Sequence, residues 1–149
     1  MRSIIRVVGV GSPHGDDQVG WRLAEGLADE TGSGLEAVVI ADPIDLLVHL
    51  DGCESLIVLD ACRTGRPPGT VTCLTWPDGG LETTGGRSTH GYGVASALAL
   101  AHALGRLPPS VILFAVEAGV CEPAAELSPE VRRSLPEVRR QLQALLRRR

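Results

Sequence analysis

The sequence predicts an α/β fold built on a mainly parallel sheet of five strands. Strand signals and helix signals alternate along the chain, which is the pattern of repeated strand–helix units. No internal repeat and no low-complexity linker divides the 149 residues, a length that fits one domain spanning 1–149. The hydrophobic fraction of 44% and the charged fraction of 21% are typical of a globular protein.

The five expected strands are short apolar runs, of the kind found in sheets that are covered on both faces. They comprise residues 4–10, 37–41, 56–59, 70–74 and 111–116. The run 56–59 leads directly into Asp60, so we expect this strand to end at the aspartate. The glycine-rich residues 76–87 are expected to form a loop.

Two helices are expected in the first third of the chain. After the turn at 11–15, apolar residues recur every four positions, which predicts an amphipathic helix; they are Val19, Leu23 and Leu27. Asp16 is a natural N-cap for this helix, and its charge suits the helix dipole. Residues 44–50 are typical of a short helix that follows Pro43.

Two later helices have start signals in the sequence. Ser88 or Thr89 is expected to cap a helix over residues 91–104. Ser128, followed by proline, predicts the start of a C-terminal helix, because proline is favoured at the first helical position. Pro136 inside this helix is expected to kink or split it.

The composition argues against several classes of function. A net charge of −4 does not provide the basic face of a general nucleic-acid-binding protein. No apolar run reaches the ~18 residues of a membrane helix, and the run 4–10 is too short and interrupted for a signal peptide. The four cysteines form no CxxC pair, so we expect buried thiols in a reduced, cytoplasmic setting.

Three residues able to bind a metal or transfer a proton are expected at one rim of the sheet. In open α/β sheets, ligands bind outside the carboxyl ends of the strands. Asp17 follows the first strand, Asp60 ends the third, and His90 follows the fourth. In the commonest doubly wound order the first and third strands are neighbours, so the two aspartates should converge.

Two carboxylates and one imidazole suit a divalent cation such as nickel or zinc. A helix N-terminus disfavours the protonated form of His90 and so helps it to bind metal. Each residue also has a simpler role: Asp16 or Asp17 could only cap the helix, Asp60 could be a buried structural carboxylate, and His90 could be a turn residue. Their occurrence together favours a site.

Other residues offer further alternatives. His14 lies in the first loop and could be an additional ligand, whereas His49 and His102 lie inside expected helices and are expected to be structural. Cys62 could form a nucleophilic pair with His90.

The glycine turn at 9–11 invites a dinucleotide-binding interpretation. The full GxGxxG pattern needs glycine at position 14, where this chain has His14. Asp16 and Asp17 at the helix start would also repel a pyrophosphate. A nucleotide-binding protein is therefore the third of our hypotheses.

Four segments, in this order, resemble the hydrogenase maturation endopeptidase family. The first contains a glycine turn, two aspartates, a spacer pair and a glycine, and the second has an aspartate at the end of an apolar strand. The third has a histidine after a polar pair, and the last has a strand, a Glu-Pro loop and a final helix. In this chain they are residues 9–20, 59–61, 88–91, and 112–116 with 122–123 and 127–129.

The resemblance implies a three-layer α/β/α sandwich and a metal-dependent hydrolase. The family removes a C-terminal extension from the large subunit of nickel–iron hydrogenase after nickel insertion. Asp17, Asp60 and His90 stand at the family's nickel-contacting positions, so they are the expected catalytic and metal-binding residues. The hydrogenase large-subunit precursor is the expected partner, and the nickel is expected to be carried by this substrate.

The chain departs from the family pattern at three places. Ser12 replaces the usual asparagine and Gln18 stands where glycine is frequent. The family's Asp-Gly-Gly segment after the second strand is replaced by Asp-Pro-Ile-Asp at 42–45. Glycines there would let a substrate backbone approach closely. Their loss favours a second hypothesis, a non-catalytic metal-checkpoint or binding module of the same fold that acts on another partner.

Overall fold

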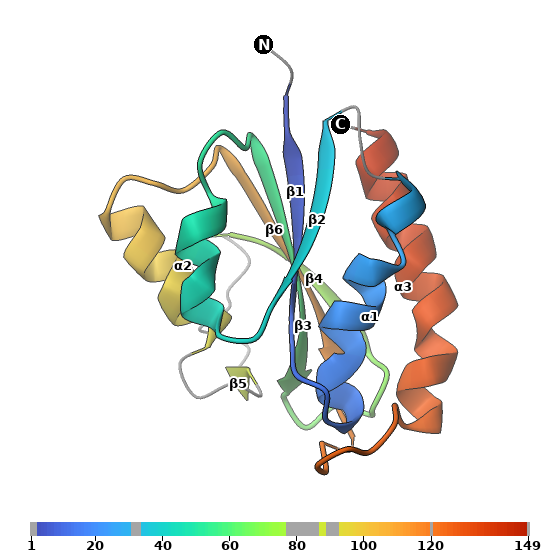
Figure 1. The fold of residues 1–149 in the computed structure, drawn as a ribbon. Helices are drawn as coiled ribbons and strands as arrows, with labels where there is room; N and C mark the ends of the chain where they lie inside the picture. The colour runs from blue at the N-terminus through green and yellow to red at the C-terminus, as the bar shows by residue number, and fades with distance from the viewer. Residues whose placement is uncertain (1–2, 31–33, 77–86, 89–92, 120, 149) are drawn as a thin grey trace.

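The computed structural model describes residues 3–30, 34–76, 87–88, 93–119 and 121–148, and it has three layers (Figure 1). Its strands are β1 (Ile5–Val10), β2 (Leu35–Ile40), β3 (Ser55–Arg63), β4 (Val71–Thr75), β5 (Arg87–Ser88) and β6 (Ser110–Glu117). Its α-helices are α1 (Val19–Glu25), α2 (Val94–Ala103) and α3 (Pro129–Arg147). The 3-10 helices are η1 (Gly15–Gln18), η2 (Ala28–Glu30) and η3 (Pro43–His49).

The sheet has the strand order β2-β1-β3-β6-β4 in the described part of the chain. β1 runs parallel to both β2 and β3, and β3 runs parallel to β6. β4 is an antiparallel edge strand against β6, and the two-residue β5 pairs antiparallel with β3. The prediction of a mainly parallel sheet is confirmed, as is the neighbouring position of the first and third strands.

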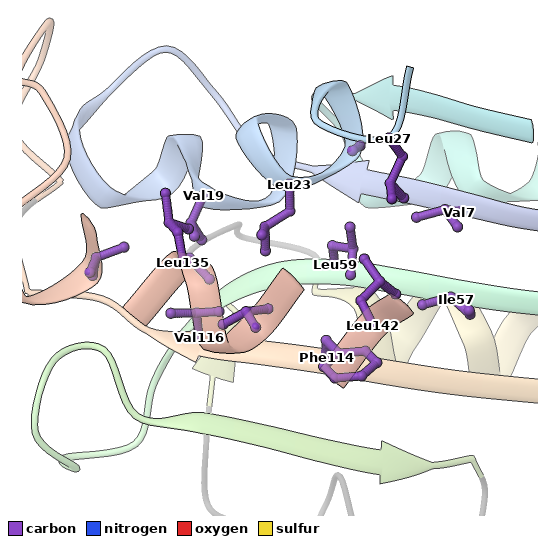
Figure 2. Packing of buried hydrophobic residues seen from close by; sticks show 14 of the residues in the cluster. Val7, Val19, Leu23, Leu27, Ile57, Leu59, Phe114, Val116, Leu135 and Leu142 are labelled. Atoms are coloured by element: carbon purple, nitrogen blue, oxygen red, sulfur yellow. The ribbon is translucent and has the colours of Figure 1, made fainter. Parts of the chain in front are cut away.

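Helices cover both faces of the sheet, which confirms the expected three-layer sandwich (Figure 1). α1 and α3 pack on one face over a hydrophobic cluster that includes Leu23 and Leu142 (Figure 2). η3 and α2 cover the other face with a second cluster that includes Leu46 and Leu98. β3 is buried over its first seven residues, as expected for a central strand covered on both sides.

Two expected boundaries near the carboxyl rim are wrong. β3 continues to Arg63 instead of ending at Asp60, because β6 still pairs with it at Cys62 and β5 pairs with it at its last two residues. α2 begins at Val94 instead of residue 91. Its N-cap is Gly93, whose φ of +58° favours glycine and which has no side chain to cap the helix.

α3 begins as predicted, with Ser128 as its N-cap and proline in the first turn. Of the two expected effects of Pro136, a kink or a split, the split does not occur, since the helix runs unbroken to Arg147. Proline removes one backbone hydrogen bond, but the residues around it, Leu135 and Val138, are buried and hold the helix on the sheet. Among the described helices, none has the length and apolar composition needed to cross a membrane.

The start of α1 lies unusually close to the sheet because two glycines face it. A Cβ on Gly20 would lie 2.3 Å from the carbonyl oxygen of Val10 and 2.5 Å from that of Leu59. A Cβ on Gly9 would lie 2.3 Å from the carbonyl oxygen of Gly20. These contacts hold α1 against β1 and β3 at the rim where the functional residues are expected.

We predict that Gly20→Ala lowers the free energy of unfolding by about 3 kcal/mol, because the clashing atoms are backbone and cannot move aside cheaply. The matched control is Gly26→Ala at the end of α1, where the nearest atom to a Cβ is 3.4 Å away. The control should stay within about 1 kcal/mol of the wild type. Urea unfolding followed by circular dichroism measures both. Equal stability of the two variants would show that the contact is not a constraint.

Candidate active site

Asp17 lies in η1, the turn that follows β1, and only 7% of its surface is exposed. Its Oδ2 accepts a hydrogen bond from the Ser12 hydroxyl at 2.5 Å. The backbone N–H of Ser12 donates to the Asp17 carbonyl oxygen at 3.2 Å, so the loop closes on itself. Ser12, a departure from the family pattern, therefore fixes one oxygen of the Asp17 carboxylate.

Asp60 lies within β3 and is 4% exposed. Its Oδ1 accepts a hydrogen bond from the backbone N–H of Ala61 at 2.8 Å. The register between β1 and β3 ends at Gly9 and Leu59, so Ala61 lies beyond the last pair of that ladder. A buried N–H needs an acceptor, and the neighbouring carboxylate supplies it. The Asp60 side chain is thereby fixed just beyond the last pair between β1 and β3.

Asp17 and Asp60 reach the same rim from two elements that are in contact. η1 lies against β3. Gly20, three residues after Asp17, packs on the carbonyl of Leu59, the residue before Asp60. The structure therefore brings both predicted carboxylates to the carboxyl ends of β1 and β3.

Arg63, at the exposed end of β3, lies within electrostatic reach of this rim. A hydrogen bond to Cys121 raises the pKa of the Arg63 guanidinium, and the negative charges of Asp17 and Asp16 raise it further. The rim is thus acidic, with a cationic side chain at its edge.

Asp16 does not cap the helix, so this prediction is wrong. α1 begins after Gln18 and η1 begins after His14, and neither start has a side-chain cap. The carboxylate of Asp16 is fully buried and accepts hydrogen bonds from the N–H of Gly119 at 2.7 Å, the N–H of Ser128 at 2.6 Å and the hydroxyl of Ser128 at 2.8 Å. These donors are 103 and 112 residues away, and a local pattern cannot indicate them.

His90 lies outside the described residues. Ser88, two residues before it, pairs with Cys62 in the ladder between β5 and β3. Within the described ranges, no three His, Cys, Asp or Glu side chains form a group that could hold a metal. The three-residue metal site therefore stays a prediction.

Glu117 is a further buried carboxylate at this rim, and no sequence motif had singled it out. It ends β6 opposite Cys62 and is 3% exposed. Its Oε2 accepts from the N–H of Thr64 at 2.8 Å, and its Oε1 accepts from the Thr64 hydroxyl at 2.5 Å. The available signal was an acidic residue directly after the apolar run 111–116, the same signal that identified Asp60.

Cys62 is unsuited to act as a nucleophile in the structure as described. Burial, which is the largest cause, and the carboxylates of Glu117 and Asp60 together raise the pKa of its thiol to about 12. Its Sγ lies 3.8 Å from Oε1 of Glu117, to which it donates. A thiol with this pKa stays protonated at neutral pH, whereas the thiolate is the nucleophile. The protonated thiol therefore does not favour a nucleophilic Cys62–His90 pair.

The remaining histidines lie in the first loop, in η3 and in α2. Nδ1 of His14 accepts a hydrogen bond from the N–H of Ala124 at 3.1 Å, so this nitrogen is used within the protein. His49 ends η3 and His102 lies in α2, which confirms their expected place in helices.

The glycine turn after β1 serves internal packing. A Cβ on Gly11 would lie 2.5 Å from the carbonyl oxygen of Asp17 and 3.1 Å from the ring of Trp21. Gly9 faces Gly20 in the same way. Because the protein's own backbone fills this space, the turn offers no support for dinucleotide binding.

The high pKa of Cys62 predicts slow alkylation in the folded protein. At pH 9 about 0.1% of a thiol with a pKa of about 12 is thiolate, against about half in the unfolded chain, where the pKa is near 9.0. Iodoacetamide at pH 9 should therefore label Cys62 far more slowly without urea than with it, as peptide mapping would measure. Equal rates would contradict the raised pKa.

The same pKa has a consequence for stability. Between about pH 9 and 12 the folded state binds more protons at Cys62 than the unfolded state does, so stability falls as the pH rises through this range. The contribution is fully present below pH 9. Cys62→Ser should reduce the fall in the free energy of unfolding between about pH 9 and 12, as urea titrations at several pH values would measure. If the fall with pH is the same in this variant, groups other than Cys62 cause it.

The fold and the rim define a class of protein: an α/β/α sandwich with two buried aspartates at the carboxyl ends of neighbouring parallel strands. The model of a family described as hydrogenase maturation protease matches residues 39–144, which include Asp60 and His90. The chain therefore belongs to the hydrogenase maturation protease family. This confirms the resemblance and the expectation of a hydrolase of the endopeptidase type.

Solved structures share this fold over nearly the whole chain. The hydrogenase maturating endopeptidase HybD from E. coli is 23% identical, with a TM-score of 0.76 over 97% of this chain and 93% of that one. An endopeptidase from Escherichia coli is 26% identical, with a TM-score of 0.83 over the same shares. The [NiFe] hydrogenase maturation protease HybD from Thermococcus kodakarensis is 23% identical, with a TM-score of 0.75 over 95% of this chain and 98% of that one. No curated protein sequence matches the chain.

Proposed function

We propose that this protein is a cytoplasmic endopeptidase that removes the C-terminal extension of a nickel-loaded hydrogenase large-subunit precursor. Asp17, Asp60 and His90 recognise the nickel, which the precursor carries. The observation that carries this proposal is the position of Asp17 and Asp60, which are buried on contacting elements at one rim. Carboxylate and imidazole ligands suit a borderline divalent cation.

The chain path supports the inclusion of His90. Ser88 pairs with Cys62, which is two residues after Asp60, and His90 is two residues after Ser88. The β5–β3 ladder thus holds Ser88, the last described residue before His90 in the sequence, at this rim.

The proposed chemistry is hydrolysis of one peptide bond in the precursor. The substrate's nickel acts as a Lewis acid, which either polarises the scissile carbonyl or activates a water, and either effect is worth several kcal/mol. The protein's residues hold the metal and with it the adjoining peptide. A precursor without nickel would lack the group that these ligands recognise, so cleavage would follow metal insertion.

We predict that Asp17→Asn and His90→Ala each abolish processing of the nickel-loaded precursor while the fold survives. Removal of one ligand from a three-ligand set should lower the rate at least about 100-fold. The shortened large subunit is measured by mass spectrometry, and circular dichroism checks the fold. Asp29→Asn and His102→Ala are matched controls, because both side chains are exposed and lie outside the rim. Full cleavage by both ligand variants would refute the assignment.

A non-catalytic binding module is the second candidate, and one observation favours it. Residues 42–45 replace the glycines of the family, and here Oδ1 of Asp42 caps η3 by accepting from the N–H of Ile44 at 3.1 Å. A capped helix with proline in its first turn gives a substrate backbone less freedom of approach than glycines do.

Incubation with the nickel-loaded precursor separates the two functions. We expect a loss of mass from the precursor, which identifies an enzyme. A stable complex with an intact precursor would identify a binding module, and size-exclusion chromatography with mass spectrometry would detect it.

A further inference from the structure

We propose that Asp16 is a positioning residue, which holds the turn that presents Asp17 to the substrate's metal. The inference rests on the proposed role of Asp17. Asp16 itself is fully buried, so it acts through its neighbour and not by contact with the substrate.

The N-terminus of α3 holds the Asp16 carboxylate. Ser128 is the N-cap of this 19-residue helix, and both its N–H and its hydroxyl donate to Asp16. The Ser128 hydroxyl in turn accepts from the N–H of Val131 in the first turn of α3. The positive end of a helix dipole stabilises a carboxylate at this place. Asp16 therefore joins η1 to the longest described helix through charge-assisted hydrogen bonds.

The residues on either side of Asp17 are fixed to the same part of the chain. The N–H of Gly15 and the side-chain Nε2 of Gln18 both donate to the carbonyl oxygen of Ala125 at 2.8 Å. His14 accepts from the N–H of Ala124. Asp17, by contrast, bonds to Ser12 in the preceding loop. The turn is thus held by the segment 124–128, together with Gly119, while the Asp17 carboxylate bonds to Ser12.

The backbone of this segment is held in a costly conformation. Ala124 has a φ of +59°, the left-handed region that favours glycine. Such a conformation persists when the surrounding contacts over-determine it. Here the contacts are those with the turn, through His14, Gly15 and Gln18. The segment therefore gives η1 a rigid support.

Rigidity of this kind matters for metal recognition because ligand oxygens must be placed closely. Residues that orient a metal ligand typically contribute 10- to 100-fold to affinity or activity. Asp16→Asn replaces one oxygen by an NH2 group, which cannot accept from the Ser128 hydroxyl or from Gly119, so η1 loses two of the three hydrogen bonds that Asp16 accepts.

The test compares kcat/KM for cleavage of the nickel-loaded precursor, the rate with nickel-free precursor, and the thermal midpoint. Asp16→Asn should lower kcat/KM for the nickel-loaded precursor roughly 10- to 100-fold. It should also reduce the ratio of the cleavage rate with nickel-loaded precursor to the rate with nickel-free precursor. Ser128→Ala keeps two of the three donors and should lower kcat/KM roughly two- to tenfold. Val138→Ala removes buried contacts of α3 away from η1. It should lower the thermal midpoint but leave kcat/KM and the nickel preference near the wild type.

The outcomes separate the positioning role from the proposed function. If Asp16→Asn loses no more activity than Val138→Ala, after correction for the folded fraction, the positioning role is overturned. If Asp17→Asn also cleaves normally, the proposed function fails as well. If Asp17→Asn is inactive and Asp16→Asn is normal, only the positioning role fails. Should Asp16→Asn not fold, the comparison of Ser128→Ala with Val138→Ala decides: an equal kcat/KM overturns the inference.

Discussion

The close packing of α1 on the backbones of β1 and β3 is the constraint on which the rest of the rim depends. Gly9 and Gly20 have no Cβ, so the helix start can touch the carbonyl groups of both strands. If α1 lay at an ordinary helix-to-sheet distance, η1 would lie farther from β3. Asp17 would then be separated from Asp60. The glycines of the first loop, which suggest a nucleotide site by pattern, serve this approach of protein to protein.

The buried carboxylates of the rim satisfy a second constraint, since each needs donors when water is excluded. The structure supplies them from the chain itself: Ala61 to Asp60, Thr64 to Glu117, and Gly119 with Ser128 to Asp16. Ala61 lies in β3 beyond the last β1–β3 pair, whereas Thr64 and Gly119 follow strands and Ser128 begins α3. Backbone N–H groups at the start of a helix have no partner within that helix. The carboxyl rim of this sheet therefore supplies the hydrogen-bond donors that its buried acidic side chains need.

The fold was predictable because its determinants are local. Apolar runs with helical segments between them specify a parallel sheet, and the Ser128–Pro129 start of α3 was identified from two residues. Asp17 and Asp60 were assigned to one rim because strand order follows a few rules. Two of the errors concern partners that are distant in sequence. β3 passes Asp60 because β6 and β5 continue to pair with it, and Asp16 finds its donors more than a hundred residues away.

The arrangement of charge gives a physical reason for the order of events in the proposed function. Neutral donors fix Asp16, Asp17, Asp60 and Glu117 in place, but they do not cancel negative charge. A low-dielectric rim with several carboxylates attracts a divalent cation more strongly than a neutral peptide. A precursor that carries nickel brings this cation to the carboxylates, and a precursor without nickel brings none. Discrimination of this kind requires that the same site repel the wrong substrate as well as bind the right one.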